Sequence, residues 1–259
     1  MTDPVRPATD EACRFLSDYA ARLLGCGATC IRIEKNVTRM AEAFGMNVEL
    51  SIMPSFIQLS LRDPVTGTSH YEIRRKHKCA VSYNINTQLS KLSWEVADRK
   101  TDFAQARRVF EAVLRTTPTG RRTVLLLVSA ANAAFCRLFG GDAVSMLLVF
   151  LATVAGVCIR QALTERNTDI RVVFLCAAFF SSVIASGGYL FGWGHTPDIA
   201  LGTSVLYLIP GIPYINSVSD LLEGHYICAF SRFVDAAVLT ACLSAGLAAG
   251  LLGMGLSIF

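Results

Sequence analysis

The chain has 259 residues, of which 53% are hydrophobic and only 17% are charged, and its mean hydropathy is +0.45. Soluble domains average about 25% charged residues, so this composition argues against a wholly soluble protein. The net charge of +4 is small and is divided among the flanks of apolar segments, which gives nucleic-acid binding little support.

The charged residues are concentrated in the first part of the chain. Up to Pro118 there are 17 of the 24 Lys and Arg residues and 13 of the 20 Asp and Glu residues. This shift in polarity predicts a soluble domain over residues 1–117 and a membrane domain over residues 118–259. Asp10, Glu11 and Arg14 interrupt any apolar core of a secretory signal, so we expect the first domain to remain in the cytoplasm.

The soluble domain shows helical patterns on both sides of a group of strand patterns. Apolar residues at helical spacing predict a first helix with Thr9 as its N-cap and Gly25 as its stop, and a second helix over 29–44. Two more amphipathic helices are expected around 85–96 and 103–114. Between these pairs, alternation predicts two or three strands with the apolar members Val48, Leu50, Ile52, Ile57, Leu59, Leu61, Tyr71 and Ile73. This order predicts a small α+β domain with one core.

The soluble domain offers no pattern typical of catalysis. No nucleophile stands beside a base, and the nine cysteines of the chain form no CxxC pair, so we expect neither an enzyme, nor a metal site, nor a cofactor. The basic run 74–78 suits either an anionic lipid headgroup or, as we favour, the solvated end of a strand. Arg107 and Arg108, close to the membrane domain, are better placed to meet phosphates of the lipid bilayer.

Five apolar segments in the second part are long enough to span a bilayer, which takes about 20 residues for about 30 Å of hydrocarbon. They lie at about 123–140, 142–160, 170–192, 199–219 and 232–257. The loops on one side carry six arginines and those on the other carry only Arg137. Because positive charge marks the cytoplasmic side, we expect a cytoplasmic N-terminus and a periplasmic C-terminus. Gly246 and Gly250 in the last segment have the spacing that lets helices approach closely.

The fourth apolar segment contains the stretch LIPGIPYIN, residues 208–216. Pro210 and Pro213 each remove an amide donor, and Gly211 permits backbone angles that other residues avoid. We therefore predict a helix break near the middle of the bilayer, where freed backbone groups are tolerated if they line a polar cavity. A half-helix starting near Ile212 would direct its amides at an anion. The alternative is a proline kink repaired by neighbouring helices.

Polar residues in and beside the apolar segments complete the predicted binding site, because charges at membrane depth are costly and usually face a cavity or one another. The candidates for substrate binding are Asn132, Arg137, Pro210, Gly211, Pro213, Asn216 and Asp220. Arg137 is the best single candidate for meeting an anionic solute. Asp220, Asp235 and Arg232 are candidates for ion coupling, although Arg232 and Asp235 can equally form a simple ion pair near the surface.

At these residues the sequence resembles a known family. The string PGIPYINSVSDLLEGHY, followed by SRFVDA, is similar to the signature of the threonine/serine exporter (ThrE-type) family. FCRLFGGD, IRQAL and the early segment GATCIRIEKNVTRMAEAFGMNVELSIMPS fit the same pattern, so the resemblance covers nearly the whole chain. It implies a multi-pass secondary exporter of the bacterial inner membrane, in a split form that needs a small membrane partner subunit (YjjB type). The exporter would then be a hetero-oligomer.

The residues and the resemblance together predict a subunit that exports a small anionic metabolite, a succinate-type dicarboxylate above all. An exporter of threonine and serine is one alternative. A membrane-anchored sensor, whose cytoplasmic domain binds the ligand, is another. A membrane-embedded hydrolase is least favoured, since the sequence shows no plausible catalytic cluster.

Overall fold

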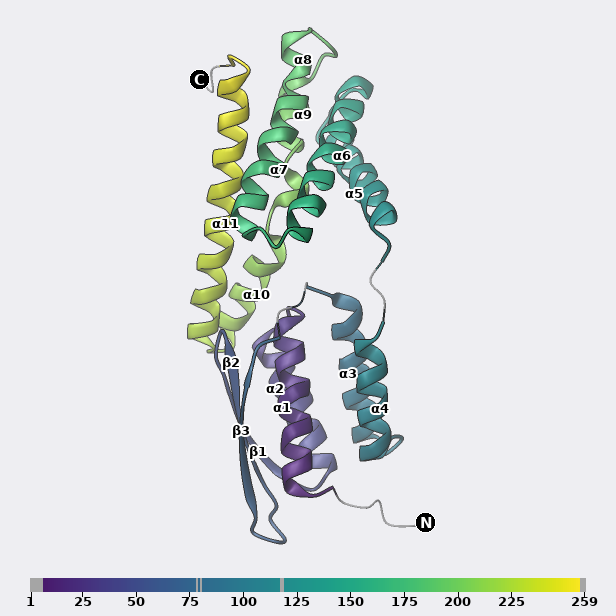
Figure 1. Cartoon of the computed structure of the whole chain (residues 1–259), viewed down its shortest axis with the longest axis vertical. Helices are drawn as coiled ribbons and strands as arrows, with labels where there is room; N and C mark the ends of the chain where they lie inside the picture. Colours follow the sequence, from purple (N-terminus) through teal and green to yellow (C-terminus); the bar gives the residue numbers. More distant parts are fainter. Residues whose placement is uncertain (1–6, 78, 80, 117–118, 257–259) are drawn as a thin grey trace. The chain divides into compact units, whose positions relative to one another are not determined.

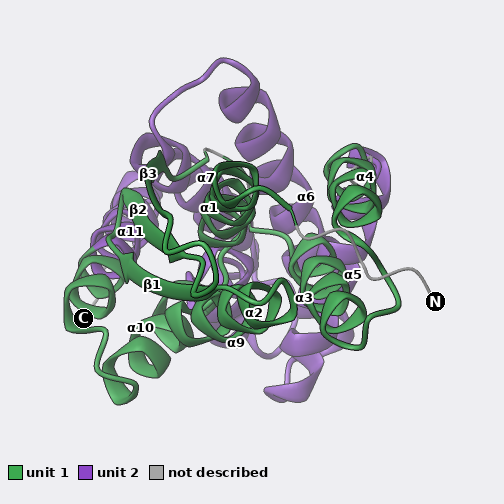
Figure 2. Cartoon of the chain, turned by 90° about the horizontal axis from the view of Figure 1, so that it is seen from below, with its two compact units in different colours: residues 1–117, 212–234 green, residues 118–211, 235–259 purple. Residues whose placement is uncertain are grey.

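The computed structural model describes residues 7–77, 79, 81–116 and 119–256, and the chain divides into two compact units, coloured separately in Figure 2. Unit 1 consists of residues 1–117 and 212–234, and unit 2 of residues 118–211 and 235–259. Residues 212–234, which follow the predicted break, thus share a compact unit with the N-terminal part of the chain. Lys78 of the basic run and the predicted boundary at 117/118 lie outside the described residues.

Unit 1 begins with two helices, α1 (Thr9–Gly25) and α2 (Cys30–Ala43), whose apolar faces form much of its core. The helical spacing predicts these faces correctly, and their fully buried members include Leu16, Tyr19, Leu23, Ile33, Val37 and Met40. The expectation of Thr9 as the N-cap is wrong, because Ala8 occupies the cap position. The Thr9 hydroxyl instead lies 3.0 Å from the hydroxyl of Thr68.

Three antiparallel strands follow in the order β1-β2-β3: β1 (Asn47–Ile52), β2 (Phe56–Arg62) and β3 (Ser69–Arg75). Ile57, Leu59 and Leu61 of β2 are fully buried. The alternation of Tyr71 and Ile73 predicts β3 correctly, but these two side chains are 56% and 53% exposed. The register explains this, since Glu72, not its neighbours, stands opposite Leu59 on the buried face.

Helices α3 (Tyr83–Ala97) and α4 (Phe103–Leu114) complete the N-terminal part of unit 1. Helices α1 and α2 contact the sheet, and α3 and α4 pack against these two helices (Figure 1). Phe15 of α1 meets Phe103 and Phe110 of α4 edge to face, with ring centroids 5.6 Å apart in both pairs. The arrangement is a small antiparallel sheet with helices layered on one face, which gives unit 1 an α+β core.

Unit 2 is helical throughout its described part. It contains α5 (Arg121–Leu138), α6 (Ala143–Glu165), α7 (Ile170–Ala185), the short α8 (Gly187–Leu190), α9 (Pro197–Thr203) and the 3-10 turn η1 (Leu206–Leu208). Two further helices cross the boundary between the units. Helix α10 (Gly211–Leu222) lies almost wholly in unit 1, and α11 (Tyr226–Gly253) belongs to unit 1 up to Val234 and to unit 2 from Asp235.

Three helical segments of the described chain are long and apolar enough to cross a membrane: 143–165, 170–190 and 226–253. A fourth candidate is the bent pair formed by 197–208 and 211–222. Length and composition of the described helices thus support three or four membrane spans, and not the five expected from the sequence. The expected span over 123–140 corresponds to α5, which carries Arg121, Arg122 and Arg137 within its 18 residues. That span stays a prediction.

The small residues of α11 pack as their spacing predicts. A Cβ added at Gly246 would collide with the backbone carbonyl oxygen of Leu175 on α7, and one added at Gly250 would overlap the Ser182 hydroxyl. The two helices can approach this closely only because glycine presents no side chain. Gly253, at the end of α11, has open space around it.

Candidate functional site

The predicted helix break is present in the structure. Helical structure ends at Leu208, Ile209 and Pro210 are non-helical, and α10 begins at Gly211. Pro213 falls in the first turn of α10, where the backbone amide has no intrahelical acceptor and proline is tolerated. Pro210 therefore lies in a true interruption and Pro213 lies in the first turn of the helix that follows it, so neither proline sits inside one continuous helix.

Buried neutral side chains gather at the end of α9, just before the break. The amide nitrogen of Asn132 on α5 donates to the Thr153 hydroxyl of α6 at 2.7 Å and to the backbone carbonyl of Thr203 at 3.1 Å. Thr203 is the last residue of α9, so its carbonyl lacks a partner within the helix. Asn132 is 3% exposed. This amide thus supplies the donor that the interrupted helix needs.

A second polar contact holds η1, between α9 and the break. The Tyr207 hydroxyl lies 3.0 Å from the Ser181 hydroxyl of α7, which also donates to the Ala152 carbonyl at 3.1 Å. Gly156 of α6 leaves room for the phenol, since a Cβ there would overlap its oxygen. Sequence reasoning misses Thr153, Ser181 and Tyr207 because single hydroxyls are common in apolar runs. The available signal is that Thr153 and Gly156 share one face of α6.

Arg137 lies in the last turn of α5, where its side chain is exposed. Its Nη1 donates to the backbone carbonyl of Gly141 at 3.2 Å, so the guanidinium caps the turn that follows its own helix. Asp142 in that turn accepts from the backbone amides of Ser145 and His195, both at 2.7 Å. The structure does not pair Arg137 with Asn132, whose amide is used by Thr153 and Thr203.

Two of the predicted site residues bind the loop between α1 and α2, within unit 1. The Asn216 amide donates to the carbonyl of Gly27 at 2.8 Å, and Nη2 of Arg232 donates to the carbonyl of Ala28 at 2.8 Å. The Ser217 hydroxyl of α10 donates to the Ala229 carbonyl of α11 at 2.7 Å and so connects the two helices. The polar faces of α10 and of the start of α11 are thus directed at the N-terminal part of unit 1.

Asp220 is the centre of this group and is fully buried. Its Oδ1 accepts from the backbone amide of Cys30 at 2.8 Å, and its Oδ2 lies 3.1 Å from Nε of Arg232. Cys30 is the first residue of α2, whose N-cap residue Thr29 provides no side-chain hydrogen bond. A carboxylate is favoured at a helix N-terminus by the unpaired amides and the dipole. Asp220 therefore caps α2 although it is 190 residues away in sequence.

The thiol of Cys30 also donates to Asp220, with 3.4 Å between the sulfur and Oδ2. Its contact with the Cys228 thiol, its burial and the Asp220 carboxylate raise the pKa of Cys30 well above the usual value. The thiol therefore stays protonated at neutral pH and can serve as a donor. We call Cys30, Asn216, Asp220 and Arg232 the capping cluster.

The ion pair in the capping cluster differs from the one the sequence suggests. Arg232 pairs with Asp220, not with Asp235, which is exposed. The structure thus brings Asn216, Asp220 and Arg232 together in unit 1. Asn132 and Arg137 belong to unit 2.

Comparison with known proteins identifies the class. The family described as "Putative threonine/serine exporter" (ThrE) matches residues 14–253 of the chain, and the chain belongs to this family. The protein is therefore a membrane transport protein and not an enzyme, which removes the hydrolase alternative. Among the described residues, no group of three or more His, Cys, Asp or Glu side chains is placed to hold a metal ion.

Two curated relatives carry the name "Probable succinate transporter subunit YjjP". The protein from Klebsiella aerogenes is 29% identical over 231 residues, which cover 88% of this chain and 88% of that protein. The protein from Escherichia coli (strain K12) is 29% identical over 239 residues, which cover 90% of this chain and 91% of that protein. No solved structure matches the chain.

Proposed function

We propose that the chain is a subunit of a secondary exporter that moves small carboxylates, succinate-type dicarboxylates above all, out across the bacterial inner membrane. The observation that carries the proposal is the break at Ile209 and Pro210 within an apolar helical pair, in a chain of an exporter family. Interrupted helices at membrane depth leave backbone groups available to a solute. The names of the two relatives support the substrate class and the need for a partner.

In this proposal the solute is bound at the interruption of the helix at Ile209 and Pro210. The Ile212 amide in the first turn of α10 faces the carboxylate with the positive end of the helix dipole, beside Pro210, Gly211 and Pro213; Pro213 has no amide hydrogen, and the Gly211 amide donates to the Ile209 carbonyl at 2.9 Å. Asn132 contributes to the site by holding the end of α9 in place. Arg137 provides a fixed positive charge at the end of α5 that attracts an anion.

The capping cluster has a different part in the proposal. Asn216, Asp220 and Arg232 hold α10 in place through the loop between α1 and α2, and do not touch the solute. Asp220 is engaged by a backbone amide, a thiol and a guanidinium, which suits a positioning role better than proton transfer. Asp235, which is exposed, is the freer candidate for coupling export to the proton gradient.

The proposed assembly contains a small membrane partner subunit of the YjjB type, with the N-terminus of this chain in the cytoplasm and its C-terminus in the periplasm. The test is efflux of labelled succinate from cells that lack both subunits and receive this chain, the partner, or both. Export should require both chains. Full efflux with this chain alone would refute the split assembly, and efflux of threonine and serine in place of succinate would favour the amino-acid alternative.

Two variants test the path itself in cells that make both subunits. Pro210→Ala with Pro213→Ala should join α9 and α10 into a more continuous helix and lower efflux while the protein still accumulates in the membrane. Arg137→Gln should abolish efflux, whereas Arg122→Gln, an exposed arginine in the first turn of the same helix, is the matched control. Wild-type rates in both path variants would contradict this location of the path.

A further inference from the structure

Strand β3 has the reverse of the polarity expected for a half-buried strand. Its register places His70, Glu72 and Arg74 opposite Leu61, Leu59 and Ile57, the fully buried face of β2. Its apolar residues, Tyr71 and Ile73, lie on the other face and are more than half exposed. Charged groups turned toward a protein interior are costly unless they are paired or serve a ligand. The charged side chains on the inner face of β3 therefore need partners on the element that packs against this face.

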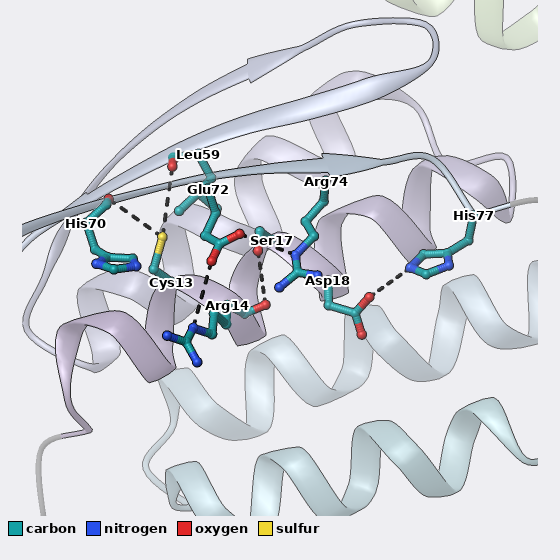
Figure 3. A network of polar contacts seen from close by, with 9 residues as sticks. All are labelled: Cys13, Arg14, Ser17, Asp18, Leu59, His70, Glu72, Arg74 and His77. Atoms are coloured by element: carbon teal, nitrogen blue, oxygen red, sulfur yellow. Dashed lines mark hydrogen bonds and ion pairs between the residues drawn. The ribbon is translucent and has the colours of Figure 1, made fainter.

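The inner face of β3 meets a polar stripe of α1. Figure 3 shows Glu72 between Arg14 and Arg74, with ion-pair distances of 3.8 Å to Nε of Arg14 and 3.5 Å to Nε of Arg74. Nε of Arg74 is buried and makes no hydrogen bond with the described residues, since its 3.5 Å contact with Glu72 is an ion pair only. Asp18 is 2.8 Å from Nε2 of His77. The network thus holds its guanidinium groups in place but leaves donor capacity unused.

A cavity of about 490 Å³ opens beside this network, between α1, β3 and α4. This size lies within the range of about 300–1,000 Å³ that is usual for small-molecule sites. Its charged lining consists of three guanidinium groups and three carboxylates, from Arg14, Arg74, Arg107, Glu11, Asp18 and Glu111. Phe15, Phe110 and Leu114 provide an apolar wall.

We propose that this cavity in unit 1 binds a small zwitterion, an α-amino acid. A guanidinium group can donate two parallel hydrogen bonds to the ligand carboxylate, in a bidentate pair. Arg107 is available for this contact because it forms no ion pair with another described residue. The carboxylates of the lining accept from the ligand ammonium group, and the apolar wall receives an aliphatic side chain. A dicarboxylate fits less well, because its second carboxylate would meet Glu11, Asp18 or Glu111 with no surplus of positive charge.

The site is separate from the proposed transport path and does not depend on it. It shares helix α1 with the capping cluster, since the loop that follows α1 accepts the hydrogen bonds of Asn216 and Arg232. From Asp18 to Gly25 the helix rises by about 10 Å. An amino acid bound at the cavity therefore contacts the same helix whose end holds α10 in place.

The experiment is calorimetric titration of the purified full-length chain in detergent micelles. The probes are the twenty L-amino acids, succinate, and two single-charge relatives of L-alanine, propionate and ethylamine. At least one amino acid should bind with a submillimolar Kd. L-alanine should bind more tightly than both of its single-charge relatives, and succinate should bind more weakly than the best amino acid. The assignment would be overturned if no amino acid bound at concentrations up to 10 mM, which corresponds to a binding free energy weaker than about 2.7 kcal/mol. It would also be overturned if succinate bound more tightly than every amino acid.

Variants of α4 locate the binding without threatening the fold, because Arg107 and Glu111 are both exposed at the rim of the cavity. Arg107→Gln and Glu111→Gln should each weaken the best amino acid about tenfold or more, the loss typical of a charged hydrogen bond. Arg108→Gln is the matched control, since Arg108 is the exposed neighbour on α4 and does not line the cavity. Equal affinity in all three variants would mean that the ligand binds elsewhere and would overturn the proposal.

Discussion

Replacing Asp220 by alanine should destabilise unit 1 more than any other single change in α10. The carboxylate is fully buried and is shared by the Cys30 amide at 2.8 Å and by Nε of Arg232 at 3.1 Å. Removing one partner of a buried ion pair costs about 3–5 kcal/mol, because the other charge is left without compensation. The side chain of Arg232 is 17% exposed, so water screens part of that loss and we expect about 3 kcal/mol.

Two related variants separate the charge from the cap. Asp220→Asn retains an oxygen that can accept from the Cys30 amide but loses the ion pair, so it should cost less than alanine, about 1–3 kcal/mol. Adding Arg232→Gln to Asp220→Asn should cost less than the sum of the two single changes, since the double variant leaves no unpaired charge. Asp235→Ala, which removes an exposed carboxylate three positions after Arg232, is the control and should change stability by at most about 0.5 kcal/mol.

The assay is urea unfolding in detergent micelles, followed by the fluorescence of Trp94 on α3 in a Trp193→Phe background. Trp94 reports on unit 1, where the guanidinium of Arg39 lies 3.6 Å from the centre of its ring. Hydrogen exchange of a peptide covering residues 28–34 tests the cap directly, because the Cys30 amide should exchange faster when Asp220 is alanine. If Asp220→Ala unfolds like Asp235→Ala and this peptide keeps its protection, the capping role of Asp220 is wrong.

Three further predictions concern other contacts. Asn132→Leu should lower stability by about 1–3 kcal/mol, because the Thr203 carbonyl loses its donor in a buried place, and a thermal melt would detect the change. Gly246→Val should lower the same melting temperature, since its side chain would meet the Leu175 backbone, whereas Gly253→Ala, with open space, should not. Cys26 and Cys79, with sulfurs 3.5 Å apart, should form a disulfide when diamide is added as oxidant. Burial raises the pKa of Cys26 to about 12, so its thiolate is scarce at neutral pH and the rate of disulfide formation should rise with pH. Mass spectrometry after alkylation at several pH values measures that rate, and absence of the disulfide at every pH would mean that the two thiols do not meet.

The features that sequence predicts correctly are those set by local backbone chemistry. Pro210, Gly211 and Pro213 interrupt the helix because of their own backbone restrictions, whatever surrounds them. The apolar faces of α1 and α2 follow from helical periodicity, and the close approach at Gly246 follows from the absence of a side chain. Each of these inferences needs no knowledge of a distant partner.

The features that sequence does not predict depend on contacts between distant segments. Asp220 and Cys30 are 190 residues apart, and neither residue carries a local sign that it will meet the other. For the same reason, the sequence offers Asp235 and Asp220 equally as partners for Arg232, and only the position of the loop between α1 and α2 distinguishes them. Tyr71 and Ile73 alternate as core residues do, but which face of β3 is buried depends on pairing with β2.

Helix α10 shows how the two kinds of information combine. Its polar residues Asn216 and Asp220, four positions apart, are buried in unit 1, while Ile215, Val218 and Leu222 are 69%, 56% and 81% exposed. A helix in water does the opposite, so this distribution indicates an apolar environment, lipid or protein, for the outer face. The first turn of the same helix begins at the break. A helix whose inner face is held by charged and polar contacts, and whose outer face is apolar, can be moved as a rigid element by the loop that holds it. In the proposed exporter, the N-terminal part of unit 1 therefore sets the position of the start of α10, where the Ile212 amide lies.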